Sequence, residues 1–393
     1  MSWFRLKDKA NRKQRLIMYL VGFILAISVA LPAFIQSNFI SQFISLELVS
    51  LFFVLANSTT AVMIAIFPRL INRLGNYFSS KIVMIVYATA LLGMAAANGP
   101  FSATLTLLLF IVSSNLLWIN IDIILEEASI DNETGRIRSL FLTFMNLGWI
   151  IAPTISAYLV TIGEYPLPFL ASALLVIPLF AVISRNKKNL KDKSKFKKEK
   201  ILTSWKKLWK NKNLRGVFMS AIALNLFFSG AVIYIPIYLH QYLGMEWSQL
   251  GWIFSFMLVP FVLFEIPAGF LADKYFGEKE MLIIGLFIVF LSSILFSLIK
   301  VASPLVWAAV LFFSRIGAAL VESMRDTYFF KKVSSKDIGF INIFRMTNPI
   351  GYATGTAFGA LFLLFLPINY LFLVFAILLL PAFYFVAGIK DTK

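Results

Sequence analysis

The stretch LLLFIVSSNLLWINIDIILEE, residues 107–127, is a long apolar run that ends in carboxylates one helical turn apart, at Asp122 and Glu126. An α-helix needs about 20 mostly apolar residues to cross a bilayer, so this stretch predicts a membrane-spanning helix. Comparable stretches occur at 16–40, 44–67, 82–98, 101–125, 139–162, 166–184, 214–239, 248–272, 281–299, 303–321, 338–364 and 367–388. The sequence therefore predicts an all-α polytopic membrane protein with twelve transmembrane helices.

A second copy of the opening pattern begins 200 residues further on, in WAAVLFFSRIGAALVESMRDT, residues 307–327. Asn115, Asp122 and Glu126 then align with Arg315, Glu322 and Asp326, and nearby shifts align Gly75 with Gly277 and Gly148 with Gly351. Such internal repeats are typical of transporters whose two halves alternate access to a site near the midplane of the membrane. The repeat predicts two pseudo-symmetric six-helix bundles, at 1–184 and 213–393.

The segment 185–212 between the bundles is expected to be a basic cytoplasmic linker. Its first part is rich in lysine and contains few apolar residues. From residue 201 onward, apolar residues such as Trp205 and Leu208 recur at helical spacing between lysines. This pattern predicts an amphipathic helix that lies on anionic lipid.

Composition excludes several classes of function. Hydrophobic residues make up 60% of the 393 residues and charged residues only 14%, whereas a soluble domain has about 25% charged residues. The net charge of +17 would suit nucleic-acid binding, but the lysines and arginines gather in alternate loops. By the positive-inside rule, this distribution indicates a multi-pass protein of the cytoplasmic (inner) membrane with both termini in the cytoplasm, and no nucleic-acid partner. Because the chain has no cysteine, no thiolate metal site is expected, and the sequence indicates no metal and no cofactor.

The loop between the stretches at 248–272 and 281–299 carries the motif GFLADKYFGEK, residues 269–279. It resembles the GxLADxxGRK signature of the major facilitator superfamily (MFS), with one inserted residue before the second glycine. The matching positions are Gly269, Asp273, Lys274 and Gly277. In the first half, PRLINRLGNY at 68–77 is a weaker copy that keeps Arg73 and Gly75 and has Asn72 in place of the aspartate.

The resemblance implies the MFS fold and a gate formed by these loops. In the family, charged contacts at this position lock the inner gate while the outer side is open. The corresponding pairs here would be Arg73 with Glu126 or Glu127, and Lys274 with Asp326. A simple positively charged turn without a gating role is the alternative.

Two further resemblances to the family are partial. The segment GWIIAPTISA, residues 148–157, resembles the antiporter motif GxxxGPxxGG and keeps Gly148 and Pro153, although alanine and serine replace three of the glycines. The segment RIGAA, which begins at Arg315, resembles an arginine motif that the family carries in its fourth helix. The first resemblance implies antiport.

Five ionisable residues lie within predicted spans or at their inner ends, where a charge costs at least about 2.5 to 3.5 kcal/mol. These residues are Asp122, Glu322, Arg315, Arg345 and Glu265, and for Glu265 we expect a structural role. We expect Asp122 and Glu322 to carry protons, with Arg315 as their counter-charge or as the anchor for an anionic substrate group. Glu322 and Arg325 are close enough in sequence to pair on one helix face. A buried charge network that only holds the halves together is the alternative for this set.

The sequence thus predicts a secondary active transporter rather than an enzyme. It would be a monomer that moves a small molecule across the lipid bilayer, coupled to protons, with export favoured over import. A non-transporting membrane sensor or assembly factor on the same fold is one alternative. A membrane-embedded transferase is another, but the sole histidine, His240, lies outside any acidic or serine constellation.

Overall fold

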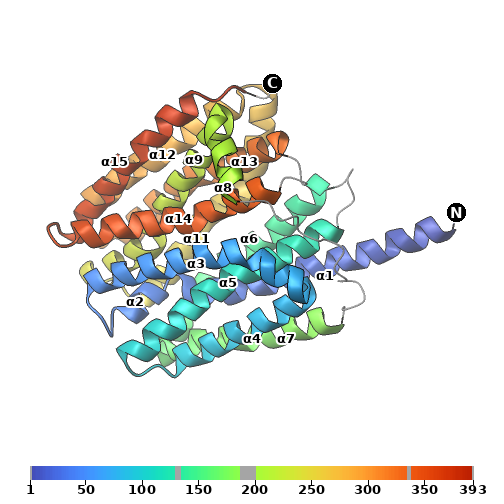
Figure 1. Cartoon of the computed structure of the whole chain (residues 1–393). Coiled ribbons are helices and arrows are strands. Elements are labelled where there is room, and N and C mark those ends of the chain that lie inside the picture. The colour runs from blue at the N-terminus through green and yellow to red at the C-terminus, as the bar shows by residue number, and fades with distance from the viewer. Residues whose placement is uncertain (1, 129–133, 186–200, 334–337, 392–393) are drawn as a thin grey trace. The chain divides into compact units, whose positions relative to one another are not determined.

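The computed structural model describes residues 2–128, 134–185, 201–333 and 338–391, and all regular secondary structure in these ranges is helical. The first half contains α1 (Ser2–Ala33), α2 (Gln36–Ile40), α3 (Leu46–Leu74), α4 (Asn76–Ala95), α5 (Pro100–Ala128), α6 (Thr134–Gly163) and α7 (Pro166–Arg185). The second half contains α8 (Ile201–Lys210), α9 (Lys212–Ser229), η1 (Gly230–Tyr234), α10 (Ile235–Ile237), η2 (Tyr238–Tyr242), α11 (Trp247–Lys274), α12 (Glu278–Leu298), α13 (Pro304–Lys332), α14 (Ile338–Phe362) and α15 (Ile368–Ala387). Figure 1 labels these elements.

Eleven spans in the described part of the chain are long and apolar enough to cross a membrane, and they match eleven of the twelve expected stretches. The segment from α9 through η2 forms one of them, Lys212–Tyr242. The remaining expected span is α14, which has 25 residues but contains polar residues at Asn342, Arg345 and Asn348. The expected all-α polytopic architecture is therefore confirmed in the described part of the chain.

The chain divides into two compact units, one of Met1–Ile35 with Ile66–Phe196 and the other of Gln36–Ala65 with Lys197–Lys393. The second unit thus includes α2 and the first part of α3. Within it, the Tyr234 hydroxyl donates a hydrogen bond of 2.8 Å to Ser50 Oγ, and Gln241 Nε2 donates one of 2.9 Å to Asn38 Oδ1. Hydrogen bonds to the π-helical part of the span Lys212–Tyr242 therefore hold residues Gln36–Ala65 in the second unit.

In the first unit, α1 packs against α6 and α7, and α4 packs against α5 and α7. Gly148 makes the approach of α6 to α1 possible, because a Cβ there would lie 3.0 Å from the carbonyl oxygen of Phe23. Further along α1, Ser28 shares hydrogen bonds of 3.0 Å with Tyr87 on α4 and with Ser172 on α7. Small and hydroxyl-bearing residues thus bring the helices of this unit together, as is common in membrane proteins.

In the second unit, α14 packs on α9, and α12 packs on α13. Gly351, the repeat counterpart of Gly148, lies against α9, where a Cβ would meet the Ile222 carbonyl oxygen at 2.8 Å. Gly355 and Gly359 continue the same face of α14 against Ser229 and Tyr234. The aligned residues Gly148 and Gly351 therefore each allow two helices to approach closely, one pair in each half.

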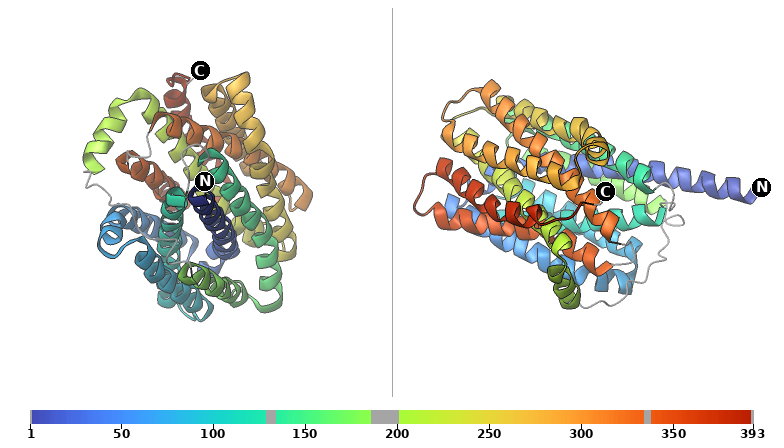
Figure 2. Two further views of the ribbon diagram at one scale, coloured as in Figure 1. Left: turned by 90° about the vertical axis from the view of Figure 1, so that its right-hand side faces the viewer. Right: turned by 90° about the horizontal axis from the view of Figure 1, so that it is seen from above.

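Helix α8 forms where the sequence predicts an amphipathic helix, and it crosses the long helices of its unit at a steep angle (Figures 1 and 2). Leu208 on its apolar side is buried, and Trp205 makes an edge-on contact with Phe218 of α9 at 4.9 Å between ring centroids. Lys206, Lys207 and Lys210 are exposed. Part of the apolar side thus packs on protein rather than on lipid.

Candidate substrate and coupling site

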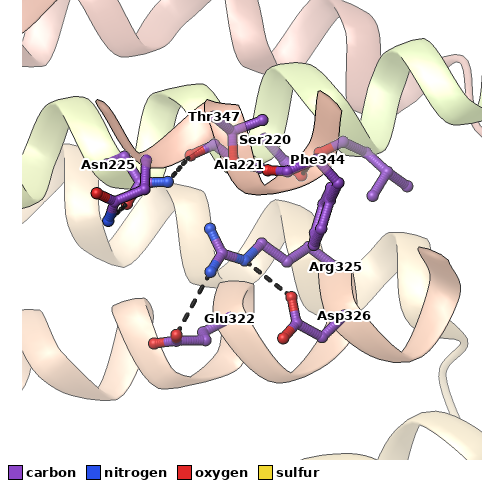
Figure 3. A network of polar contacts seen from close by, with 10 residues as sticks. Ser220, Ala221, Asn225, Glu322, Arg325, Asp326, Phe344 and Thr347 are labelled. Atoms are coloured by element: carbon purple, nitrogen blue, oxygen red, sulfur yellow. Dashed lines mark hydrogen bonds and ion pairs between the residues drawn. The ribbon is translucent and has the colours of Figure 1, made fainter. Parts of the chain in front are cut away.

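Helix α13 carries a short charged network (Figure 3). The Arg325 guanidinium donates from Nη2 to Glu322 Oε1 at 3.4 Å and from Nε to Asp326 Oδ1 at 3.2 Å. Arg325 is buried, and the ring of Phe344 on α14 lies 5.8 Å from its guanidinium carbon. The pairing of Glu322 with Arg325 expected from their spacing is confirmed. Asp326, the expected gate partner of Lys274, is also paired with its neighbour Arg325.

Arg315 lies two turns before Glu322 on the same helix and has different surroundings. Its side chain is only 1% exposed, and its guanidinium carbon lies 5.4 Å from the ring centroids of both Phe227 and Phe228 on α9. Nε and Nη1 are buried without a hydrogen-bond partner among the described residues. Arg315 is therefore a buried cation whose direct contacts are aromatic.

Two asparagines join α9 to α14 beside this charged region. Asn348 Nδ2 donates a hydrogen bond of 3.0 Å to Asn225 Oδ1, and Asn225 Nδ2 donates one of 2.8 Å to the carbonyl oxygen of Ala221. Arg345, which precedes Asn348 by three residues on α14, is partly exposed. Asn348 thus contacts α9, the helix that also supplies the rings around Arg315.

In the first unit, Asp122 lies near the end of α5 and is partly exposed. Asn115, the counterpart of Arg315, donates a hydrogen bond from Nδ2 to the carbonyl oxygen of Ile111 at 2.9 Å. The side chain of Glu126 lies outside the described residues. The described part of α5 has no arginine or lysine, whereas its counterpart α13 contains Arg315 and Arg325. Only the second of these two helices therefore has basic residues to pair with its own carboxylates.

The loop motif forms the end of α11 and the start of α12. Gly277 has φ of +115°, and Gly75 has φ of +83°, so both need the left-handed freedom of glycine where the next helix begins. Gly269, in contrast, lies within α11, and an added Cβ would have nothing within 4 Å. The second glycine of the signature is therefore a structural requirement, whereas the first does not bring helices together here.

The side chains that the structure describes at the matching charged positions of the two loop copies are exposed. Lys274 is exposed, with Nζ 5.4 Å and 5.3 Å from the ring centroids of Phe270 and Tyr275. Asn72 and Arg73 are exposed at the end of α3. The side chain of Asp273 lies outside the described residues. The two gate pairs expected from the family stay predictions.

Sequence reasoning missed the contacts that fix the start of α12. Asp391 Oδ1, from the end of the chain, accepts a hydrogen bond of 2.9 Å from the Lys279 amide. Glu278, whose side chain is 3% exposed, pairs with Lys331 Nζ at 2.7 Å. These partners are 112 and 53 residues apart in sequence, so no local pattern joins them.

Replacing Asp391 with alanine should lower the free energy of unfolding by about 1 kcal/mol, because the first turn of α12 would lose its carboxylate cap. Lys390→Ala is the matched control, since Lys390 contacts Asn213 and Tyr328 through its backbone only and its side chain is exposed. Thermal unfolding of the purified protein measures both variants. Equal midpoints for the two would contradict the assigned role of Asp391.

Comparison with known proteins identifies the fold and the family. The family model described as the Major Facilitator Superfamily matches residues 15–255 and 241–392. The crystal structure of a mutant of the nucleoside transporter NupG matches with a TM-score of 0.74 and 17% sequence identity, over 96% of this chain and 100% of that one. The search of curated proteins gave no match. At this identity the structural match establishes the fold alone, and the family match covers almost the whole chain.

The predicted resemblance and the MFS fold are therefore confirmed. Members of this family are transporters rather than enzymes, which also agrees with the sequence. The chain is a multi-pass membrane protein that belongs to the major facilitator superfamily.

Proposed function

We propose that the protein is a proton-coupled secondary transporter that moves a small solute across the cytoplasmic membrane by alternating access, with export favoured over import. The alternation of basic loops supports an orientation with both termini in the cytoplasm. We also propose that it works as a monomer, with bundles at 1–184 and 213–393 joined by the basic linker.

The observation that carries the proposal is the charge arrangement within α13, which contains two arginines and two carboxylates in one membrane-spanning helix. Each such charge costs at least about 2.5 to 3.5 kcal/mol in a bilayer, so charges inside spans are retained mainly at substrate and ion pathways. Glu322 is held by Arg325 at 3.4 Å, while 34% of its side chain remains exposed. A carboxylate with both features can exchange a proton and also form an ion pair.

Asp122 is the corresponding carboxylate of the first half. Protonation of Glu322 would weaken its ion pair with Arg325, and release of the proton would restore it. Asp122 would change its charge in the same way. Such a difference in interaction energy between two states is what a coupling ion needs to shift the equilibrium between access states. Arg345 remains a candidate for binding substrate, and the loops containing Asn72, Arg73, Asp273 and Lys274, with Glu126 and Asp326, remain the proposed gate.

Counterflow in proteoliposomes tests whether the protein transports at all. Vesicles preloaded with an unlabelled solute should accumulate the labelled form transiently, and empty vesicles should not. The panel would contain neutral, cationic and anionic organic compounds, together with nucleosides because the matched fold includes a nucleoside transporter. Absence of exchange for every compound, in vesicles with correctly folded protein, would contradict the proposal and favour a non-transporting role.

A further inference from the structure

Arg315 is the least satisfied charged group in the described part of the second unit. A guanidinium carries five N–H donors, and here Nε and Nη1 are sealed from solvent without an acceptor. Arg325, only ten positions later, has two carboxylates on its guanidinium. The difference shows that α13 contains acceptors for one arginine and lacks them for the other.

The aromatic contacts of Arg315 do not satisfy its hydrogen-bond donors. The faces of the two rings attract the cation, but neither ring accepts a hydrogen bond from Nε or Nη1. A buried ion is stabilised in full only when hydrogen bonds satisfy its remaining donors. The rings therefore position the guanidinium and leave its donors available.

Glu322 does not supply the missing acceptor. It lies seven residues from Arg315, which corresponds to about 10 Å along a helix axis, and its carboxylate is bound to Arg325. Arg315 thus offers hydrogen-bond donors without a competing acceptor among the described residues.

We propose that Arg315 forms a subsite for the negatively charged group of a small organic anion, a carboxylate or a phosphate. A guanidinium binds either group through two parallel hydrogen bonds, and the Phe227 and Phe228 rings hold it in place for this contact. The inference rests on the proposed transport function, and it adds that the solute is an anion. Glu322 and Asp326 remain bound to Arg325 and do not compete for the subsite.

Thermal unfolding of the purified protein in neutral detergent tests the subsite without requiring any flux. The probes are benzoate and phenyl phosphate, with benzamide as the neutral compound of similar shape, all at the same ionic strength. We expect at least one of the anions to raise the unfolding midpoint of the wild type in a saturable manner, and benzamide to leave it unchanged. Stabilisation by benzoate alone or by phenyl phosphate alone tells a carboxylate from a phosphate substrate.

Two variants assign the effect to Arg315. Arg315→Gln should abolish the response. Arg315→Lys keeps the cation but loses the two-pronged geometry, and it should raise the half-saturating anion concentration about tenfold even if Arg315→Gln does not fold. Arg215→Gln is the matched control, because Arg215 also lies over two rings, Trp209 and Phe385, and it should respond like the wild type.

The proposal would be overturned if neither anion stabilises the wild type more than benzamide does. It would also be overturned if Arg315→Lys, or a folded Arg315→Gln, responds with the affinity of the wild type. Saturable anion binding without exchange in the counterflow assay would instead contradict the transport function and leave the subsite standing. Exchange of neutral solutes alone, without anion binding, would support the transport function and overturn the subsite.

Discussion

Replacing Gly351 with leucine should prevent stable packing of α14 on α9. A Cβ at this position would lie 2.5 Å from Asn225 Cβ, 2.8 Å from the Ile222 carbonyl oxygen and 3.0 Å from the Asn225 carbonyl carbon. Two of these atoms belong to the backbone of α9, which cannot turn aside as a side chain can. Overpacking of this kind costs about 3 kcal/mol or more where the backbone must move, so we expect a large fall in the unfolding midpoint.

Gly269→Leu provides the matched control for this prediction. It makes the same change in side-chain volume within a long helix of the same unit, at a site with nothing within 4 Å of an added Cβ. Thermal unfolding and the yield of monodisperse protein after purification measure both variants. A Gly351→Leu protein as stable as Gly269→Leu would show that α14 does not approach α9 as described.

The double variant Asp122→Asn with Glu322→Gln should lose solute accumulation driven by a pH gradient. One pH unit supplies about 1.4 kcal/mol per proton, which supports about tenfold accumulation, and two units support about a hundredfold. Without the carboxylates of Asp122 and Glu322, the solute should only equilibrate. Counterflow should persist, since exchange of solute for solute needs no net movement of protons.

Glu164→Gln is the control for loss of a carboxylate, because Glu164 is exposed in the connection between α6 and α7. It should accumulate solute as the wild type does. Gradient-driven accumulation by the double variant at the wild-type level would contradict the assignment of both carboxylates. It would favour the alternative that these residues only form a structural charge network.

Local patterns in the sequence predicted the helices and the contacts within them. The apolar stretches located the spans, and the three-residue spacing of Glu322 and Arg325 predicted their ion pair, because such pairs depend on helix geometry alone. A shift of 203 residues also aligned Gly148 with Gly351, and both lie where one helix approaches another closely. These successes share one cause, the regular geometry of the α-helix.

Contacts between distant residues could not be predicted in this way. The Phe227 and Phe228 rings around Arg315 come from a different helix, and 41 phenylalanines in the sequence give no indication of which two would be chosen. The cap from Asp391 on α12 likewise joins residues more than a hundred positions apart. The grouping of Gln36–Ala65 with the second unit depends on hydrogen bonds such as Tyr234 to Ser50, which no repeat or hydropathy pattern indicates.

The lumenal pH of proteoliposomes, recorded while a transported solute is added to one side, tests the central claim of proton-coupled transport most directly. With wild-type protein and no imposed gradient, the solute should change the lumenal pH at a rate that saturates with its concentration. The double variant of Asp122 and Glu322 should give no change, although it still exchanges solute. Saturable solute movement by the wild type at constant lumenal pH would contradict proton coupling.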